Sequence, residues 1–174
     1  MIHHRKTLVA TVGLGGAAAF TTVLIVGPAI ATPPTGGFSP STIFVGEFDP
    51  FDVKAEKTDK WDLALKSKGV TDLRVNRVSF PAHSSSGWHS HPGPNLLTVT
   101  IGEVVEYEGD NPLCTPTVYH TGDTFGDNGG SAVHLVRNET GVAAEVMAVA
   151  LYPHGVTPLT TSQPKPTNCG EDIL

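Results

Sequence analysis

The stretch Gly87-Trp88-His89-Ser90-His91-Pro92-Gly93-Pro94-Asn95 decides how the chain is interpreted, together with His134 further along. Side chains alternate faces along a strand, so His89 and His91 would project the same way and could bind one metal ion. A useful site needs at least a third ligand, and His134, in the apolar run Val133-His134-Leu135-Val136, is the candidate. An isolated His-x-His also occurs in proteins without metal, and a lone histidine on an apolar strand is often a core residue.

Short runs rich in β-branched and aromatic residues surround this stretch. Strands are predicted at 42–48, 51–56, 59–67, 72–80, 96–101, 103–107, 117–120, 133–137 and 144–152. Gly102-Glu103 indicates a hairpin between two of them, and 126–131 is predicted to be a loop. Because no long helical period follows the N-terminal segment, the pattern predicts one all-β domain, a sandwich or barrel.

The N-terminal segment has the pattern of an export signal. A basic start that includes Arg5 and Lys6 precedes a long uncharged apolar run, which ends in Ala29-Ile30-Ala31. Residues 1–31 are therefore predicted to be a cleaved signal peptide, and the protein to be secreted. The alternative is an uncleaved signal anchor, since the run is long enough to cross a bilayer. Residues 32–41, rich in proline and glycine, are predicted to be a linker.

The charge of the chain excludes some classes of partner. Loss of Arg5 and Lys6 with the signal would leave 9 of the 11 basic residues against 17 acidic ones. No basic block remains, so we expect no nucleic-acid partner and, after signal cleavage, no membrane partner.

Both cysteines, Cys114 and Cys169, lie in the part of the chain predicted to be exported. An oxidising compartment permits a disulfide, which would tie a C-terminal tail, 157–174, to the barrel. Two free thiols or a thiolate metal ligand are the alternatives.

Two motifs around the histidines resemble those of the cupin family. His89-Ser90-His91-Pro92-Gly93-Pro94-Asn95, with Gly102 beyond it, is similar to the first cupin motif; Gly122, Asn128-Gly129-Gly130, His134 and Asn138 are similar to the second. The resemblance implies a double-stranded jelly-roll β-barrel over residues 42–156, with a metal near its centre, and a homodimer formed through its sheets.

This chain departs from the cupin motifs at three positions. Asn95 stands where cupins commonly have a glutamate ligand, Asn128 where they have the turn proline, and His83 where the first motif has an early glycine. An Asn side chain can offer a metal only its carbonyl oxygen, so Asn95 is at best a weak fourth contact. What remains is a three-histidine site, which resembles the thiol and diketone dioxygenase branches of the family.

Three functional interpretations follow. The first is a secreted cupin that binds a divalent transition metal, Fe, Zn, Mn, Ni or Cu, through His89, His91 and His134, and acts as a small-molecule-binding module. The second is an Fe(II)-type dioxygenase acting on a small molecule, with His120 as a secondary candidate for an acid or base near the metal. The third is a metal-free structural cupin.

Overall fold

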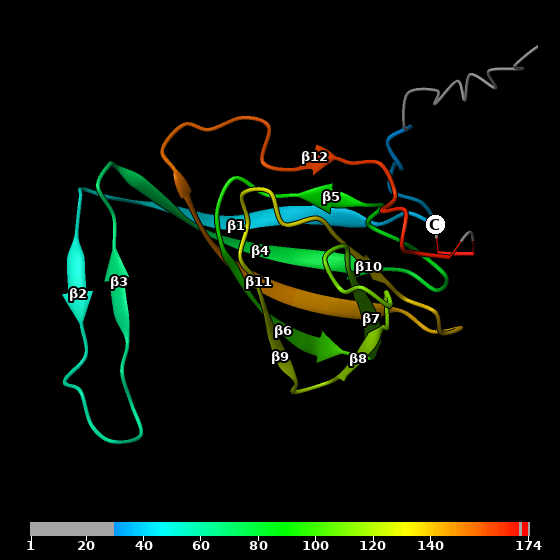
Figure 1. The fold of residues 1–174 in the computed structure, drawn as a ribbon, viewed down its shortest axis with the longest axis horizontal. Coiled ribbons are helices and arrows are strands. Elements are labelled where there is room, and N and C mark those ends of the chain that lie inside the picture. The colour runs from blue at the N-terminus through cyan, green and yellow to red at the C-terminus, as the bar shows by residue number, and fades with distance from the viewer. Residues whose placement is uncertain (1–29, 171, 174) are drawn as a thin grey trace, which may run out of the picture.

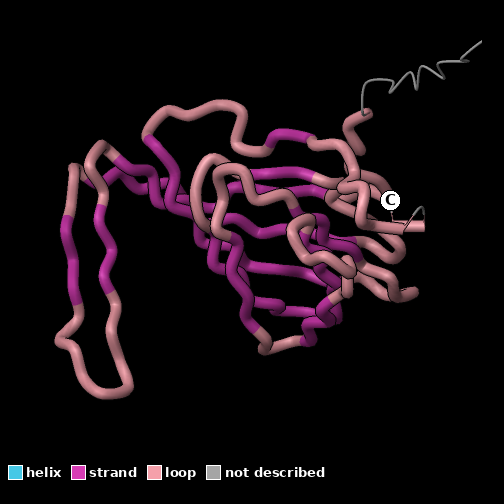
Figure 2. Tube along the Cα trace, viewed as in Figure 1, coloured by secondary structure: helices cyan, strands magenta, loops and turns pink. Residues whose placement is uncertain are grey.

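Two five-stranded antiparallel sheets form the body of the chain in the computed structural model, which describes residues 30–170, 172 and 173 (Figure 1). In order, the first sheet contains β1 (Ser39–Phe48), β4 (Thr71–Phe80), β11 (Ala144–Pro153), β6 (Asn95–Ile101) and β9 (Thr124–Asp127). The second contains β12 (Thr161–Ser162), β5 (His89–Ser90), β10 (His134–Arg137), β7 (Glu103–Glu108) and β8 (Thr117–His120). The predicted all-β, double-sheet fold class is confirmed, and Figure 2 shows strands and loops but no helix in the described part of the chain.

A small hairpin stands apart from the two sheets. It consists of β2 (Asp52–Lys54) and β3 (Ala64–Lys66), which pair with each other and extend away from the body (Figure 1). The strand predicted over 59–67 is therefore shorter than expected. None of the described segments is a helix of the length and hydropathy needed to cross a membrane.

Gly102 does not close a hairpin, so that prediction is wrong. β6 belongs to the first sheet and β7 to the second, and the chain changes sheets at Gly102 (φ 74°). The chain changes sheets again at Gly122 (φ 98°), between β8 and β9. β8 pairs with β7 in the second sheet, and β9 pairs with β6 in the first. Thr121 N–H donates to the Gly102 carbonyl at 3.0 Å, which joins the two bends. A two-stranded ribbon thus folds across both sheets, as in a jelly roll.

One apolar core lies between the sheets. Its buried members are Phe80, Val99, Val104, Phe125, Val136, Ala144 and Val146. Because side chains alternate along a strand, Val105 and Leu135 face the other side of the second sheet. There they pack with Trp88, Tyr107 and the two cysteines in a second buried cluster.

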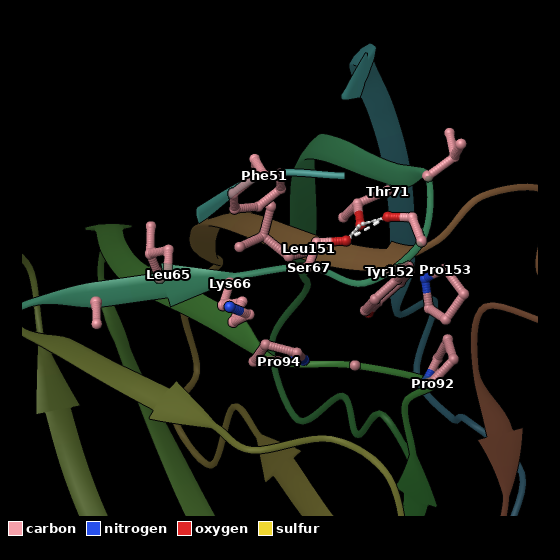
Figure 3. Close-up of a pocket in the computed structure, with 14 residues that line it drawn as sticks. Phe51, Leu65, Lys66, Ser67, Thr71, Pro92, Pro94, Leu151, Tyr152 and Pro153 are labelled. Carbon is pink, nitrogen blue, oxygen red and sulfur yellow. Dashed lines mark hydrogen bonds between the residues drawn. The ribbon is translucent and has the colours of Figure 1, made fainter. Parts of the chain in front are cut away.

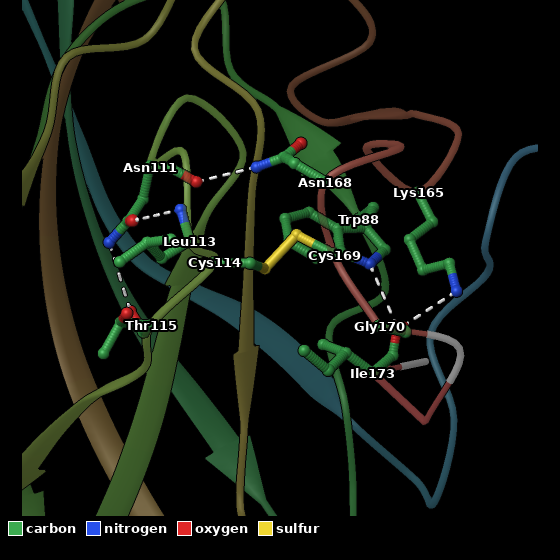
Figure 4. Close-up of a disulfide and its surroundings, with 10 residues drawn as sticks. All are labelled: Trp88, Asn111, Leu113, Cys114, Thr115, Lys165, Asn168, Cys169, Gly170 and Ile173. Atoms are coloured by element: carbon green, nitrogen blue, oxygen red, sulfur yellow. Dashed lines mark hydrogen bonds between the residues drawn. A yellow bond between two sulfur atoms is a disulfide. The ribbon is translucent and has the colours of Figure 1, made fainter.

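The predicted disulfide is confirmed. Cys114 and Cys169 are bonded, with their Cα atoms 5.2 Å apart, and both are buried in the second cluster (Figure 4). Trp88 Nε1–H in the same cluster donates to the Ile173 carbonyl at 3.4 Å. The bond therefore holds the C-terminal segment against the outer face of the second sheet.

The predicted boundaries at both ends of the barrel need correction. β1 begins at Ser39, inside the predicted linker, and Thr32 N–H donates to the Gln163 carbonyl at 3.1 Å. At the other end β12 pairs with β5, so the predicted tail contributes a strand to the second sheet. Proline and glycine suggested free segments here, but hydrogen bonds attach both to the barrel. The predicted signal peptide lies almost wholly outside the described residues.

Candidate metal centre

Three histidines from neighbouring strands converge at the inner face of the second sheet. His89 lies on β5, His91 directly follows that strand, and His134 lies on β10, where it is paired in register with His89. His89 Nε2 lies 3.0 Å from His91 Nε2 and 3.1 Å from His134 Nε2. The structure thus brings together the three predicted ligand residues, with one ring nitrogen of each facing a common point.

The opposite nitrogen of each ring faces a hydrogen-bond acceptor. Nδ1 of His89 is 2.8 Å from the Gly87 carbonyl, and Nδ1 of His91 is 3.1 Å from the Leu159 carbonyl. Nδ1 of His134 is 3.1 Å from Oε1 of Glu106. Carbonyl and carboxylate oxygens only accept, so each Nδ1 carries the proton and each Nε2 keeps its lone pair. Metal-bound histidines have this same arrangement, with the second nitrogen donating to a fixed acceptor.

Burial keeps the rings of His89 and His91 neutral. Desolvation, together with the neighbouring His134 and His91, lowers the pKa of His89 to about 3. Desolvation, followed by the effect of His134, also lowers the pKa of His91. Nε2 lone pairs directed at one point repel each other unless a cation lies between them. This donor set fits a divalent transition metal ion, for which imidazole is a preferred ligand.

Asn95 lies beside the histidines with both ends of its amide in hydrogen bonds. Its Oδ1 accepts from the Tyr152 hydroxyl at 2.8 Å, and its Nδ2 donates to Oδ2 of Asp127 at 2.9 Å. Asp127, in turn, lies 3.8 Å from His91 Nε2 and 3.9 Å from His134 Nε2. Burial raises the pKa of Tyr152 to about 12, so its hydroxyl stays protonated and able to donate.

Two carboxylates near the histidines were missed from the sequence. Glu106 is buried at the inner face of β7, where alternation from Val104 could have placed it. A buried carboxylate needs a partner, and that would have been a signal. Asp127 ends β9, which is short and contains Gly126; the sequence there predicted a loop, so no signal was available.

A cavity of about 410 Å³ opens over the histidines between the two sheets. Its apolar lining comes from Phe38, Val78, Leu97, Val136 and Ala148, and polar groups from Thr42, Asn76, Ser86 and Tyr152. The C-terminal segment closes one side through Leu159, Thr160 and Ser162. Such a mixed, mainly apolar lining around a few polar groups is typical of small-molecule sites.

His120 lies apart from this centre. It is on β8, with its side chain 66% exposed, and its Nε2 is 3.1 Å from Oε2 of Glu103. A second His and carboxylate group consists of Glu47, Asp72 near the start of β4, and His154 just after the end of β11. His154 Nδ1 is 2.8 Å from Oδ1 of Asp72. This ion pair explains why the side chains lie close together, and no bound ion is needed.

A larger cavity, of about 470 Å³, lies beside the β2–β3 hairpin (Figure 3). Ser67 and Thr71 share a hydrogen bond of 2.6 Å at its edge, and Ser67 also donates to the Gly69 carbonyl. Of the described residues that line it, Lys66 is the one charged side chain. The described residues that line this cavity include no group of metal ligands and no paired acid and base, unlike those around the three histidines.

Several solved structures are similar to part of this chain. No family model matches the chain, and no curated protein matches it in sequence. A double-stranded β-helix protein from Klebsiella pneumoniae aligns at 18% identity over 67% of this chain and 86% of its own, with a TM-score of 0.44. A cupin superfamily protein from Desulfitobacterium hafniense aligns at 12% identity over 64% and 81%, with a TM-score of 0.40.

A predicted oxalate decarboxylase from Thermotoga maritima aligns at 19% identity over 59% of this chain and 93% of its own, with a TM-score of 0.38. Cupins and double-stranded β-helix proteins are thus among the solved structures similar to this chain. All three TM-scores lie below 0.5.

Proposed function

We propose that this chain is a secreted cupin-type barrel that binds one divalent transition metal through His89, His91 and His134 and uses it to bind a small molecule. The observation that carries the proposal is the convergence of three bare Nε2 atoms, each held in place by an Nδ1–H donated to a fixed acceptor. The disulfide fits the oxidising surroundings of an exported protein.

The spacing of the donor atoms supports a metal with open positions. Two ligand atoms at right angles on one ion, each about 2.1 Å from it, are about 3.0 Å apart. The Nε2 separations of 3.0 and 3.1 Å match this value. Three histidines on one face of an ion would leave its other positions directed toward the cavity, where a ligand could bind.

Metal analysis of the purified, exported protein tests the proposal. We expect about one equivalent of a transition metal after reconstitution, and less than about a tenth of an equivalent in His134→Ala, because two imidazoles alone bind weakly. His120→Ala is the matched control, since it removes an exposed histidine and should leave the metal content unchanged. Wild-type protein that takes up less than about a tenth of an equivalent of any such metal would refute metal binding.

Open coordination positions on the ion would also suit a second function, that of an Fe(II)-dependent dioxygenase. Fe(II) bound by three neutral ligands can accept both O2 and a substrate. Oxygen consumption by the Fe(II)-loaded protein, measured with a panel of thiols and diketones, separates the two functions. Uptake that requires one of these substrates, and is lost in His134→Ala, would establish the enzyme; no uptake with any of them favours the binding module.

A further inference from the structure

Asp127 is a buried carboxylate beside the histidines. It ends β9 opposite Asn95 on β6, and its side chain is only 2% exposed. Gly129 N–H donates to its Oδ1 at 2.8 Å and Asn95 Nδ2 donates to its Oδ2 at 2.9 Å. The carboxylate is therefore held in one orientation by two donors before any ion binds.

The amide of Asn95 is not free to bind a metal. Asp127, as a carboxylate, can only accept, so the Asn95 amide must turn its NH₂ toward it. The Oδ1 of Asn95 then faces Tyr152, whose hydroxyl donates to it at 2.8 Å. The reverse orientation would place two acceptors against each other. Asn95 thus fixes Asp127 and offers no oxygen to the histidines.

We propose that Asp127 is the carboxylate ligand of this centre and that its Oδ2 joins His89, His91 and His134 as a fourth protein ligand. This inference rests on the metal binding proposed above. Two ligands of one ion are between about 3.0 and about 4.2 Å apart when each is about 2.1 Å from it. Asp127 Oδ2, at 3.8 Å from His91 Nε2 and 3.9 Å from His134 Nε2, lies in this range for two of the three histidines. It lies outside the group of ligand atoms that are all within 4.8 Å of one another, so the carboxylate would move toward His89 when the ion binds.

The charge balance of the buried centre supports the same assignment. A divalent ion held by neutral imidazoles alone would leave two positive charges uncompensated in a desolvated site. Glu106 contributes one negative charge behind His134, and Asp127 contributes the second. The two buried carboxylates would therefore neutralise the ion, with Asp127 in the position that contacts it.

Titration of the apo protein with Mn(II) and Cu(II), with a chelator as competitor, tests the assignment. In Asp127→Asn we expect Mn(II) affinity to fall about 100-fold and Cu(II) affinity about 10-fold, because oxygen ligands matter more to Mn(II) and imidazoles to Cu(II). Asp123→Asn, an exposed carboxylate at the β8–β9 turn, is the matched control and should leave both affinities unchanged. An Asp127→Asn protein with both affinities unchanged would overturn the assignment.

A crystal structure of the Mn(II)-loaded wild-type protein decides the question even if Asp127→Asn fails to fold. An Asp127 oxygen at about 2.2 Å from the ion would support the assignment, and one beyond about 3 Å would overturn it. If Mn(II) and Cu(II) both fail to bind the wild-type protein, the proposed metal function fails and the assignment fails with it. If they bind wild type but not His134→Ala, the metal function stands whatever Asp127→Asn shows.

Discussion

Glu106 shows how one buried carboxylate can set the chemistry of a histidine. Its Oε1 accepts from Nδ1 of His134 at 3.1 Å, and the two side chains are only 5% and 7% exposed. The chain repeats this pair on the surface, where Glu103 of β7 lies 3.1 Å from His120 of β8, the strand that pairs with β7 on its other side. The buried pair orients a proposed ligand, whereas water surrounds the exposed one.

We therefore expect Glu106→Gln to weaken metal binding about 10- to 100-fold, the range found when the hydrogen-bond partner of a ligand is removed. Glutamine can still accept a hydrogen bond, but it no longer adds negative charge behind His134. Metal titration with a chelator as competitor measures the change. Glu103→Gln is the control, and equal affinities for the two variants would contradict the role given to Glu106.

The pair of Asp72 and His154 gives the chain a pH dependence away from the metal centre. The hydrogen bond from His154 lowers the pKa of Asp72, and the same bond, with help from Glu47, raises the pKa of His154. The stabilisation is lost as pH falls through the lowered pKa of Asp72. It is also lost as pH rises through the raised pKa of His154, above the usual value of 6.5.

Thermal unfolding of His154→Ala should therefore differ most from wild type at about pH 5, where both charges are present, and the difference should shrink as pH rises through the raised pKa of His154. Melting temperatures of the two proteins, measured from pH 3 to pH 9, test this. A difference that grew between pH 6 and pH 9 would contradict the assigned ion pair.

At the scale of elements, β12 connects the C-terminal segment to the histidines. It pairs with β5, where Ser162 lies opposite His89, and the Leu159 carbonyl just before it accepts from His91. The Cys114–Cys169 disulfide closes this segment onto the second sheet, over a sequence separation of 55 residues. The part of the chain that looked like a tail therefore helps to hold two of the three histidines.

Replacing both cysteines, as Cys114→Ser with Cys169→Ser, should lower the free energy of unfolding by up to about 4 kcal/mol in the chain-entropy model. For a domain of this size, that corresponds to a melting temperature lower by roughly 10 °C. Metal affinity should also fall, because the Leu159 carbonyl is no longer held at His91. Calorimetry and metal titration of the variant test both effects; an unchanged melting temperature would mean that other contacts hold the segment.

The elements that the sequence missed share a physical cause. β9 has four residues, and only Phe125 among them is an apolar side chain turned to the core, so alternation was too short to detect. β12 has two residues in a segment rich in proline and threonine, and pairing with β5 stabilises it. Longer strands with a regular apolar face, such as β4 and β11, were predicted nearly to the residue.

For the whole molecule, the sequence predicted the fold class because turn residues and apolar alternation recur along the chain. It could not predict which strands share a sheet, and Gly102 shows why. A glycine between two strands fits a hairpin and a change of sheet equally well. The same limit applied to the site: His89, His91 and His134 stand in recognisable motifs, whereas Asp127 reaches them only through the pairing of β9 with β6.

Metal binding should also stabilise the molecule as a whole. The histidines come from two paired strands, β5 and β10, so an ion binds the folded barrel and not the unfolded chain. Free metal at about 100 times its dissociation constant should add about 2.7 kcal/mol to the free energy of unfolding. Melting curves with metal and with excess chelator test this, and His134→Ala should show no response to either.

The placement of Trp88 gives the protein a built-in optical reporter. Trp88 is fully buried against the disulfide next to His89, whereas Trp61, the second of two tryptophans, is 57% exposed on the β2–β3 hairpin. Disulfides quench indole fluorescence, so the emission at short wavelength from Trp88 should brighten when the bond is reduced. The long-wavelength emission from Trp61 should stay constant. One spectrum therefore reports the state of the barrel and that of the hairpin separately.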